Sequence, residues 1–350
     1  MRFMHVLALF AVITTLPAAS QDNSAVDAAS SVSADASLSH FAAAPEVAGS
    51  IKAVAADTMD GLMKRWVADF RSRQPHVAIE MQSRASMNVP TALTSSGARI
   101  AALSRELNPS DVQAFRTMHG YAPAEIKVAL GSYDTPTHTV ALTFYVNDAN
   151  PVAKLTLQQL DAMWCTSLHR GFATQVTHWG QLGLIGRWAD APVHLVGVVL
   201  PDGVPNFIER RVCDGGEIRS GILGEKNGGP TSVLTRIVQD VAKDLYAIGY
   251  AGFHNRQPGT HAVQIAESSA GPYYSGSLDE VRRAVFPLTR FVYLYVDLPP
   301  KPAESDSAVR QFLTYVLSLE GQQEVERDGT FMPMPASIVA QQRATLQKMQ

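Results

Sequence analysis

Residues 147–165 read NDANPVAKLTLQQLDAMWC, and residues 177–197 read THWGQLGLIGRWADAPVHLVG. Thr156 and Gln159 have the spacing of a capping box, which predicts that a helix begins between them. The apolar run at 194–199 predicts a buried strand after the polar, Gly-rich loop. A capped helix followed by an apolar strand is typical of α/β proteins.

The same alternation continues on both sides of this stretch. Further strands are expected at 54–56, 76–81, 126–130, 139–146, 247–250 and 285–296. Further helices are expected at 59–70, 233–241 and 309–317. Asp57 or Thr58 is the expected cap of the first of these helices, Asn108-Pro109 begins another, and Pro287 interrupts the last strand. The order of elements therefore indicates an α/β fold without an internal repeat.

The N-terminus has the features of an export signal. A short basic segment and an apolar run at 6–16, too short to span a bilayer, predict that residues 1–20 are a signal peptide cleaved after Ser20. A buried N-terminal strand or helix is the alternative. Residues 21–50 are rich in Ala and Ser and nearly free of aromatic residues, which predicts a disordered tether before a folded part that begins near Ile51.

Composition limits the classes of protein that need to be considered. The chain has 350 residues, 46% of them hydrophobic, which suits about two globular domains. Its formal net charge of −3 gives no reason to expect nucleic acid as a partner. The sequence contains only two cysteines, Cys165 and Cys213. An oxidising compartment would permit a disulfide between them, and two separate small apolar residues are the alternative.

Signals for catalysis or metal binding are missing from the sequence. It contains no HExxH, no Walker loop and no G-x-S-x-G motif. Its histidines lack the spacing of metal ligands, and neither cysteine has a nearby histidine that would indicate a nucleophile. We therefore expect a protein that is not an enzyme and that needs neither a metal nor a cofactor.

The quoted stretch resembles the phosphate-type periplasmic substrate-binding proteins of ABC transporters. Members of that family carry N-x-x-NP-x-x-x-LTL-x-QL at a helix entry, then TWG-x-LGLTG-x-W, then a strand that ends in Gly. The resemblance resumes in DLYAIGY at 244–250, FPLTR at 286–290 and LSLEGQ at 317–322, so it covers about 300 of the 350 residues. Several matching blocks in the right order are more specific than any single motif.

The resemblance implies a two-lobed clamp of the type II periplasmic-binding-protein fold, with a mixed sheet flanked by helices in each lobe. Residues 51–138 and 264–350 would form lobe 1, and residues 139–263 would form lobe 2. The ligand would lie in a cleft between the lobes, and the chain would cross the hinge more than once.

The resemblance also implies ligand contacts just after the first strands. Segment 55–59, AADTM, is similar to the family's GSDTM and keeps Thr58, although an alanine replaces the serine. Segment 83–90, SRASMNVP, resembles GKGSSTAPP, with Ser86 retained and Asn88 in the usual place of Thr. Hydroxyl and amide groups near helix starts can replace the hydration of an oxyanion. Plain helix capping is the alternative for Thr58.

A further segment supplies the expected charge. Residues 103–106 read LSRE and closely match the family's MSRE, which makes Ser104 and Arg105 expected ligand-binding residues. An arginine can make a planar, bidentate contact with an oxyanion. An ordinary surface ion pair between Arg105 and Glu106 is the alternative.

An acidic residue is expected at the hinge. Residues 131–136 read GSYDTP and resemble a turn found in a subset of the family. Asp134 in this turn, or Asp57, could accept a proton from hydrogen phosphate and would repel an oxyanion that carries no proton. A turn-forming role is the alternative for Asp134.

The second lobe departs most from the family. Its common pattern is G-R-x-x-x-S-G-T, whereas residues 197–205 read GVVLPDGVP, without the Arg, Ser and Thr. Backbone N–H groups around Gly203 remain as donors, and Asp202 adds a negative charge.

These features lead to one functional expectation and one alternative. The resemblance implies a monomeric periplasmic solute-binding protein that captures a small oxyanion, phosphate in the first place, and delivers it to an ABC permease. The alternative is a non-transport descendant of this fold that acts as a sensor accessory or an envelope protein-interaction module.

Overall fold

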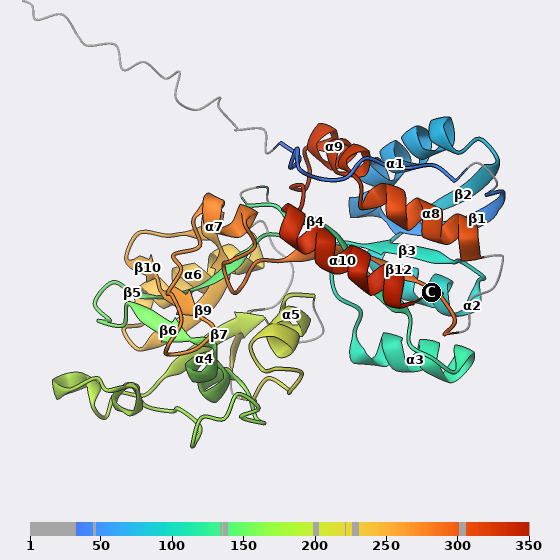
Figure 1. Ribbon diagram of the computed structural model, residues 1–350. Helices are drawn as coiled ribbons and strands as arrows, with labels where there is room; N and C mark the ends of the chain where they lie inside the picture. Colours follow the sequence, from blue (N-terminus) through green and yellow to red (C-terminus); the bar gives the residue numbers. More distant parts are fainter. Residues whose placement is uncertain are drawn as a thin grey trace, which may run out of the picture. The chain divides into compact units, whose positions relative to one another are not determined.

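The computed structural model describes residues 33–44, 47–133, 135, 139–198, 203–220, 222–225, 231–300 and 306–349. The expected signal peptide and Asp134 lie outside these residues. The described chain contains two five-stranded sheets and one two-stranded sheet, with helices packed around them (Figure 1). No helix in this part of the chain is long and apolar enough to cross a membrane.

The first sheet has the strand order β2-β1-β3-β12-β4. Its strands are β1 (Gly49–Ala56), β2 (Val77–Arg84), β3 (Ile100–Leu103), β4 (Ala124–Leu130) and β12 (Phe291–Val296). Strand β1 pairs in parallel with β2 and β3, whereas β12 is antiparallel to both β3 and β4. A strand from late in the chain therefore lies between two early ones and makes the sheet mixed.

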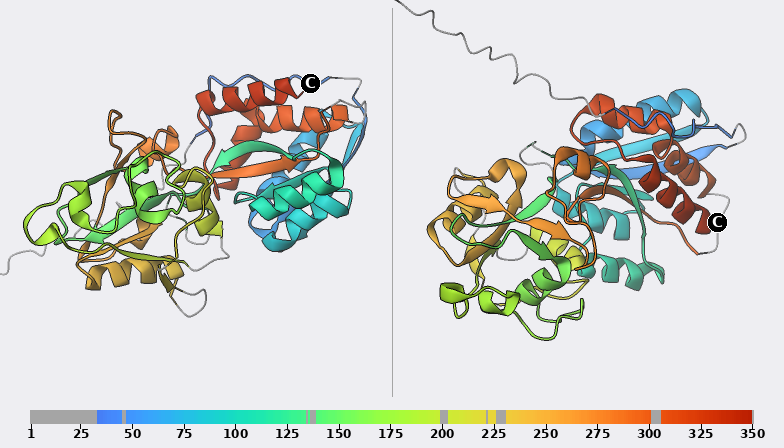
Figure 2. Two further views of the ribbon diagram at one scale, coloured as in Figure 1. Left: turned by 90° about the horizontal axis from the view of Figure 1, so that it is seen from below. Right: turned by 60° about the vertical axis from the view of Figure 1, so that its left-hand side comes forward.

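Helices cover both faces of the first sheet. They are α1 (Asp60–Arg73), α2 (Val89–Ser95), α3 (Pro109–His119), α8 (Asp306–Val316), α9 (Leu319–Asp328) and α10 (Ala336–Lys348). Figure 2 shows α2 and α3 on one face and α8 and α10 on the other. Successive residues of β1 point to opposite faces of the sheet. Val54 packs in the core under α2 and α3, and Ala53 packs in the core that includes α1 and α8.

The second sheet has the order β10-β5-β9-β7-β8. Its strands are β5 (Leu142–Asn147), β7 (His194–Val198), β8 (Leu223–Glu225), β9 (Ala247–Gly252) and β10 (Thr260–Ala262). The helices between β5 and β12 in the chain are α4 (Leu157–Trp164), α5 (Gly203–Arg211), α6 (Val233–Lys243) and α7 (Leu278–Arg282). The two-stranded sheet pairs β6 (Lys154–Thr156) with β11 (Gln264–Ala266).

Local sequence signals give the right starting points for several helices. The capping box before α4 is confirmed, because the Gln159 N–H donates to Thr156 Oγ1 at 3.1 Å and the Thr156 N–H donates to Gln159 Oε1 at 2.9 Å. Helix α3 begins directly after Asn108, as predicted. The expected cap of α1 is wrong, because a short 3-10 turn at Asp57–Met59 comes first and α1 has no side-chain cap.

The long strand expected at 285–296 is also wrong in its first half, since β12 begins only at Phe291. The preceding residues form a turn in which the Thr289 N–H donates to the Phe286 carbonyl at 3.1 Å. Pro287 in that turn has no N–H to donate to a neighbouring strand, so the sheet cannot extend through it.

Part of the expected tether is ordered against helices α1, α8 and α9, so the prediction of disorder is wrong for residues 33–44. Leu38 is buried, and the Phe41 ring lies 5.5 Å from that of Tyr315 and 5.9 Å from that of Phe70. The Phe41 N–H donates to Glu320 at 2.8 Å. Average composition suggested disorder, but a few apolar residues suffice when distant helices provide a place for them to pack.

The carboxylate of Glu320 fixes this N-terminal segment. Burial would raise its pKa, but hydrogen bonds from His40, the Phe41 N–H and Ser318 outweigh burial and lower the pKa from 4.5 to about 2. A carboxyl whose pKa is lowered on folding stabilises the fold above its unfolded value. This contribution should therefore be present above pH 4.5 and be lost as the pH falls towards 2.

We expect Glu320→Gln to release this segment. Loss of a charge-assisted hydrogen bond costs about 1.5–3 kcal/mol, so chymotrypsin should cleave after Phe41 about tenfold faster at neutral pH. Glu80→Gln, at an exposed position of β2, is the matched control and should cleave at the wild-type rate. An unchanged rate at Phe41 in the Glu320 variant would contradict the assignment.

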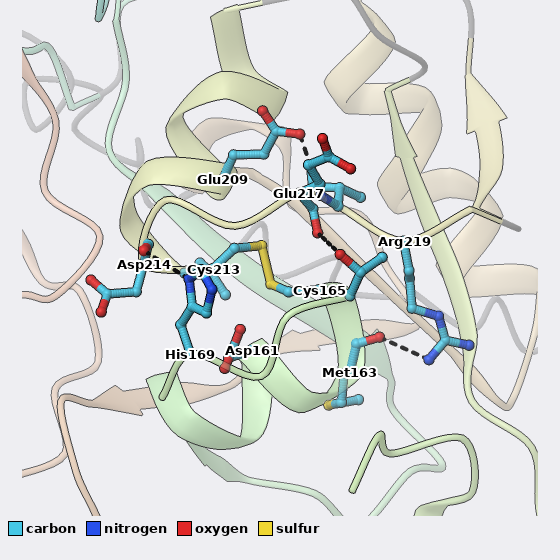
Figure 3. The surroundings of a disulfide bond; sticks show 12 residues. Asp161, Met163, Cys165, His169, Glu209, Cys213, Asp214, Glu217 and Arg219 are labelled. Carbon is cyan, nitrogen blue, oxygen red and sulfur yellow. Dashed lines mark hydrogen bonds between the residues drawn. A yellow bond between two sulfur atoms is a disulfide. The ribbon is translucent and has the colours of Figure 1, made fainter. Parts of the chain in front are cut away.

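The structure joins Cys165 and Cys213 in a disulfide, with their Cα atoms 5.5 Å apart. It links the end of α4 to the residues just after α5, as Figure 3 shows. Both cysteines are fully buried, and the buried carboxylate of Asp161 lies beside them. Of the two alternatives that the sequence left open, the chain therefore has the covalent bridge.

Candidate ligand-binding site

A pair of hydroxyl groups lies where two neighbouring strands of the first sheet end. Thr58 follows β1 and Ser104 follows β3, and their hydroxyl oxygens are 2.9 Å apart. Because β1 and β3 are parallel neighbours, their carboxyl ends meet at the same edge of the sheet. Thr139, which precedes β5, donates its hydroxyl hydrogen to the Ser104 carbonyl. The segment that leads into β5 is thus bonded to the residue that carries one of these hydroxyl groups.

Arg105 lies next to the hydroxyl pair and reaches the end of β2. Its Nε donates to Ser86 Oγ at 3.3 Å, its Nη2 to the Ser86 carbonyl at 3.4 Å and its Nη1 to the Glu106 carbonyl at 2.8 Å. These acceptors are all uncharged. No carboxylate forms an ion pair with Arg105 among the described residues, so the guanidinium charge is not neutralised within the part of the chain that the structure covers.

The surface ion pair between Arg105 and Glu106 does not form. Glu106 is only 2% exposed, and its carboxylate accepts a hydrogen bond from Tyr293 at 2.9 Å and from Arg290 Nη2 at 3.5 Å. Burial, followed by the nearby Glu106 charge, raises the pKa of Tyr293 well above its ordinary value, which keeps the phenol protonated as a donor. Glu106 is therefore occupied in the interior, and Arg105 is left for other partners.

Sequence reasoning missed the roles of Arg290 and Tyr293. Arg290 was visible only as the last residue of the FPLTR block, and no local pattern relates it to Glu106, which is 184 residues away. Its guanidinium carbon also lies 5.0 Å from the centre of the Phe207 ring in α5. Arg290 thus links Glu106, which follows β3, to Phe207 in α5.

The start of α5 approaches Arg105 directly. A Cβ atom at Gly203 would lie 3.2 Å from Arg105 Cδ, so glycine permits this close approach. Three residues further on, Asn206 Nδ2 donates to the carbonyls of Glu106 at 3.3 Å and Leu107 at 3.4 Å. The start of a helix carries a partial positive charge, and at α5 this charge adds to that of the arginine.

The structure therefore brings together most of the residues that the sequence singled out. The connected group is Thr58, Ser86, Ser104, Arg105 and Gly203. Asn88 is exposed in the same 3-10 turn as Ser86, and no described contact links it to the others. Asp57 is exposed and accepts a hydrogen bond from the Thr58 N–H at 2.9 Å. The group offers hydroxyl donors, one guanidinium and one helix start, which suits a small anion.

Comparisons with known proteins agree with this chemistry. The PBP superfamily domain matches residues 42–320. The chain is 33% identical over 315 residues to the phosphate-binding protein PstS of Pseudomonas aeruginosa strain PAO1, a match that covers 89% of this chain and 92% of that protein. Among solved structures, PstS from Borrelia burgdorferi is similar with a TM-score of 0.51 at 14% identity, covering 82% of this chain and 99% of that chain. At that identity the likeness concerns the fold alone.

Proposed function

This chain belongs to the PBP superfamily, and from that premise we propose that it is a periplasmic substrate-binding protein that captures phosphate for an ABC permease. The observation that carries the proposal is the placement of Arg105, which has uncharged partners beside hydroxyl groups and the start of α5. The similarity to a phosphate-binding protein along most of the chain favours this function over the non-transport alternative.

Each residue of the group has a defined task in this proposal. Arg105 gives phosphate a bidentate, charge-assisted contact, and Thr58, Ser86 and Ser104 turn their hydroxyl groups to the remaining oxygens. Backbone N–H groups that begin at Gly203 replace the side chains that the second-lobe loop lacks.

Two further residues complete the proposed site. Asn88 would add an amide donor from the turn that carries Ser86. Asp134 would accept the proton of hydrogen phosphate and repel sulfate, which has no proton to donate at neutral pH.

The proposal also covers the export of the protein, its location and the way it closes on its ligand. Residues 1–20 direct export, and the mature chain works in the periplasm as a monomer without catalysis. Residues 51–138 and 264–350 act as one lobe and residues 139–263 as the other, and the two lobes close on the anion like a clamp.

The test is isothermal titration of the ligand-stripped mature chain, residues 21–350, with phosphate and then with sulfate. We expect phosphate to bind and sulfate to be excluded. Arg105→Ala should weaken phosphate binding tenfold or more, since a hydrogen bond to a charged group contributes about 1.5–3 kcal/mol.

Arg116→Ala is the matched control, because Arg116 is an exposed arginine on α3 of the same lobe. Its phosphate affinity should equal that of the wild type. Equal affinity in the Arg105 variant would refute the assignment of that residue. If neither anion gives a heat of binding, phosphate capture is refuted and the non-transport alternative is favoured.

A further inference from the structure

A cavity lies at the opposite end of α5 from Arg105. Its volume is about 340 Å³, and α5, β4, β12, the turn before β12 and α10 contribute to its walls. Its lining residues are Glu106, Glu125, Lys127, Phe207, Arg210, Arg211, Ala284, Phe286, Pro287, Thr289, Phe291, Tyr293 and Ile338. Neither Arg105 nor the hydroxyl groups of the proposed phosphate site line the cavity, so the cavity is distinct from that site.

Two polar groups in the cavity wall form no hydrogen bond or ion pair with the residues that the structure describes. Thr289 is 6% exposed, and its buried hydroxyl oxygen has no hydrogen-bond partner in the described part of the chain. The Lys127 ammonium forms no ion pair with any described residue and lies over the Phe291 ring, 4.2 Å from its centre. Burial lowers the pKa of Lys127, and the nearby charge of Glu125 offsets this effect only in part. A buried polar group without a partner is costly, which indicates that something else satisfies it.

The remaining charges of the wall are matched within the protein. Arg210 makes a bidentate pair with Glu125, with both distances 2.8 Å. Arg211 donates to the Pro287 carbonyl at 2.6 Å and pairs with Glu267. Glu106 is held by Arg290 and Tyr293, as described above. Among the described residues of the wall, the positive charge of Lys127 is thus left for a ligand.

The rest of the wall is mainly aromatic and apolar. Phe207, Phe286, Phe291 and Tyr293 surround the cavity together with Pro287 and Ile338. We propose that this cavity binds a small organic monoanion that consists of a single aromatic ring and a carboxylate. The carboxylate pairs with Lys127, the Thr289 hydroxyl donates to it, and the ring packs among the aromatic side chains.

The chemistry of the wall selects this class over others. Pockets for small molecules range from about 300 to 1,000 Å³, so a cavity of this size suits a molecule with one ring. A phosphate dianion would face Glu106 and Glu125 with only one unpaired cation to balance it, and it would leave the aromatic wall without a partner. An uncharged aromatic molecule would leave Lys127 unpaired.

Benzoate and phenylacetate are the probes, with benzyl alcohol as the uncharged match of the same ring size. Binding of each probe to the full mature chain is measured by isothermal titration calorimetry and by ligand-observed NMR. We expect the two carboxylates to bind and benzyl alcohol to bind at least tenfold more weakly. Lys127→Met keeps the apolar stem and removes the charge, and it should weaken carboxylate binding tenfold or more. Thr289→Val should weaken it severalfold.

Lys154→Met is the matched control, because Lys154 also lies over an aromatic ring, that of Tyr273, but outside the cavity. This variant should bind the carboxylates as the wild type does, and so should Arg105→Ala, whose defect is confined to phosphate. The proposal is overturned if neither carboxylate binds, if Lys127→Met binds as tightly as Lys154→Met, or if benzyl alcohol binds as tightly as benzoate. The comparison of benzoate with benzyl alcohol uses only the wild type, so it decides the matter even if a variant fails to fold.

Discussion

Replacing Glu106 with alanine is expected to lower the free energy of unfolding by about 3–5 kcal/mol, which is the usual effect of breaking a buried ion pair from one side. The substitution would leave Arg290, which is 5% exposed, without its carboxylate in the interior. It would also remove the acceptor of the Tyr293 hydroxyl. Guanidinium chloride unfolding, followed by tryptophan fluorescence, measures the effect.

Two controls separate the buried charge from other causes. Glu80→Ala removes an exposed carboxylate from β2 and should change stability by less than about 0.5 kcal/mol. The double variant Glu106→Leu with Arg290→Met replaces the pair by apolar side chains and should recover much of the loss. If Glu106→Ala lowers the free energy of unfolding by less than about 1 kcal/mol, the Glu106 carboxylate is not needed to stabilise the buried Arg290 charge.

Removing the disulfide is expected to have an effect of similar size. The bridge closes a loop with a sequence separation of 48 residues. In the chain-entropy account, closing such a loop lowers the entropy of the unfolded chain and stabilises the folded protein by about 4 kcal/mol. The double variant Cys165→Ala with Cys213→Ala should therefore unfold at a markedly lower denaturant concentration than the oxidised wild type.

The reduced wild type provides the matched comparison, because the sequence has no other cysteine. Adding a dithiol reductant should bring the wild type close to the double variant and should leave the double variant unchanged. If the double variant unfolds together with the oxidised wild type, the bridge does not stabilise the protein.

The sequence was a good guide wherever the responsible residues are close together in the chain. The Thr156 and Gln159 capping box placed the start of α4, because a capping box involves residues only three positions apart. Apolar periodicity located most helices and strands for the same reason. It failed at 285–290, where a proline turn looked like the first half of a strand because of its apolar composition.

The candidate site was predictable in its residues but not in its contacts. Thr58, Ser86, Ser104 and Arg105 were recognisable because each follows a strand within a family-like segment. The adjacent positions of Arg105 and Glu106 in the sequence did not determine whether the two side chains form an ion pair. The answer depended on Arg290 and Tyr293, which reach Glu106 only because β12 lies between β3 and β4.

The sequence by itself thus determined the α/β order, the family resemblance and the residues that follow the strands, because these depend on local patterns. The tertiary structure alone decided that β12 enters the first sheet, that residues 33–44 pack beside Glu320, and that Cys165 meets Cys213. It also decided that Lys127 lies over the Phe291 ring in an aromatic cavity, with no ion pair to any residue that the structure describes. Each of these depends on groups far apart in the chain, and the burial of apolar surface that brings them together is non-directional and leaves no local signal in the sequence.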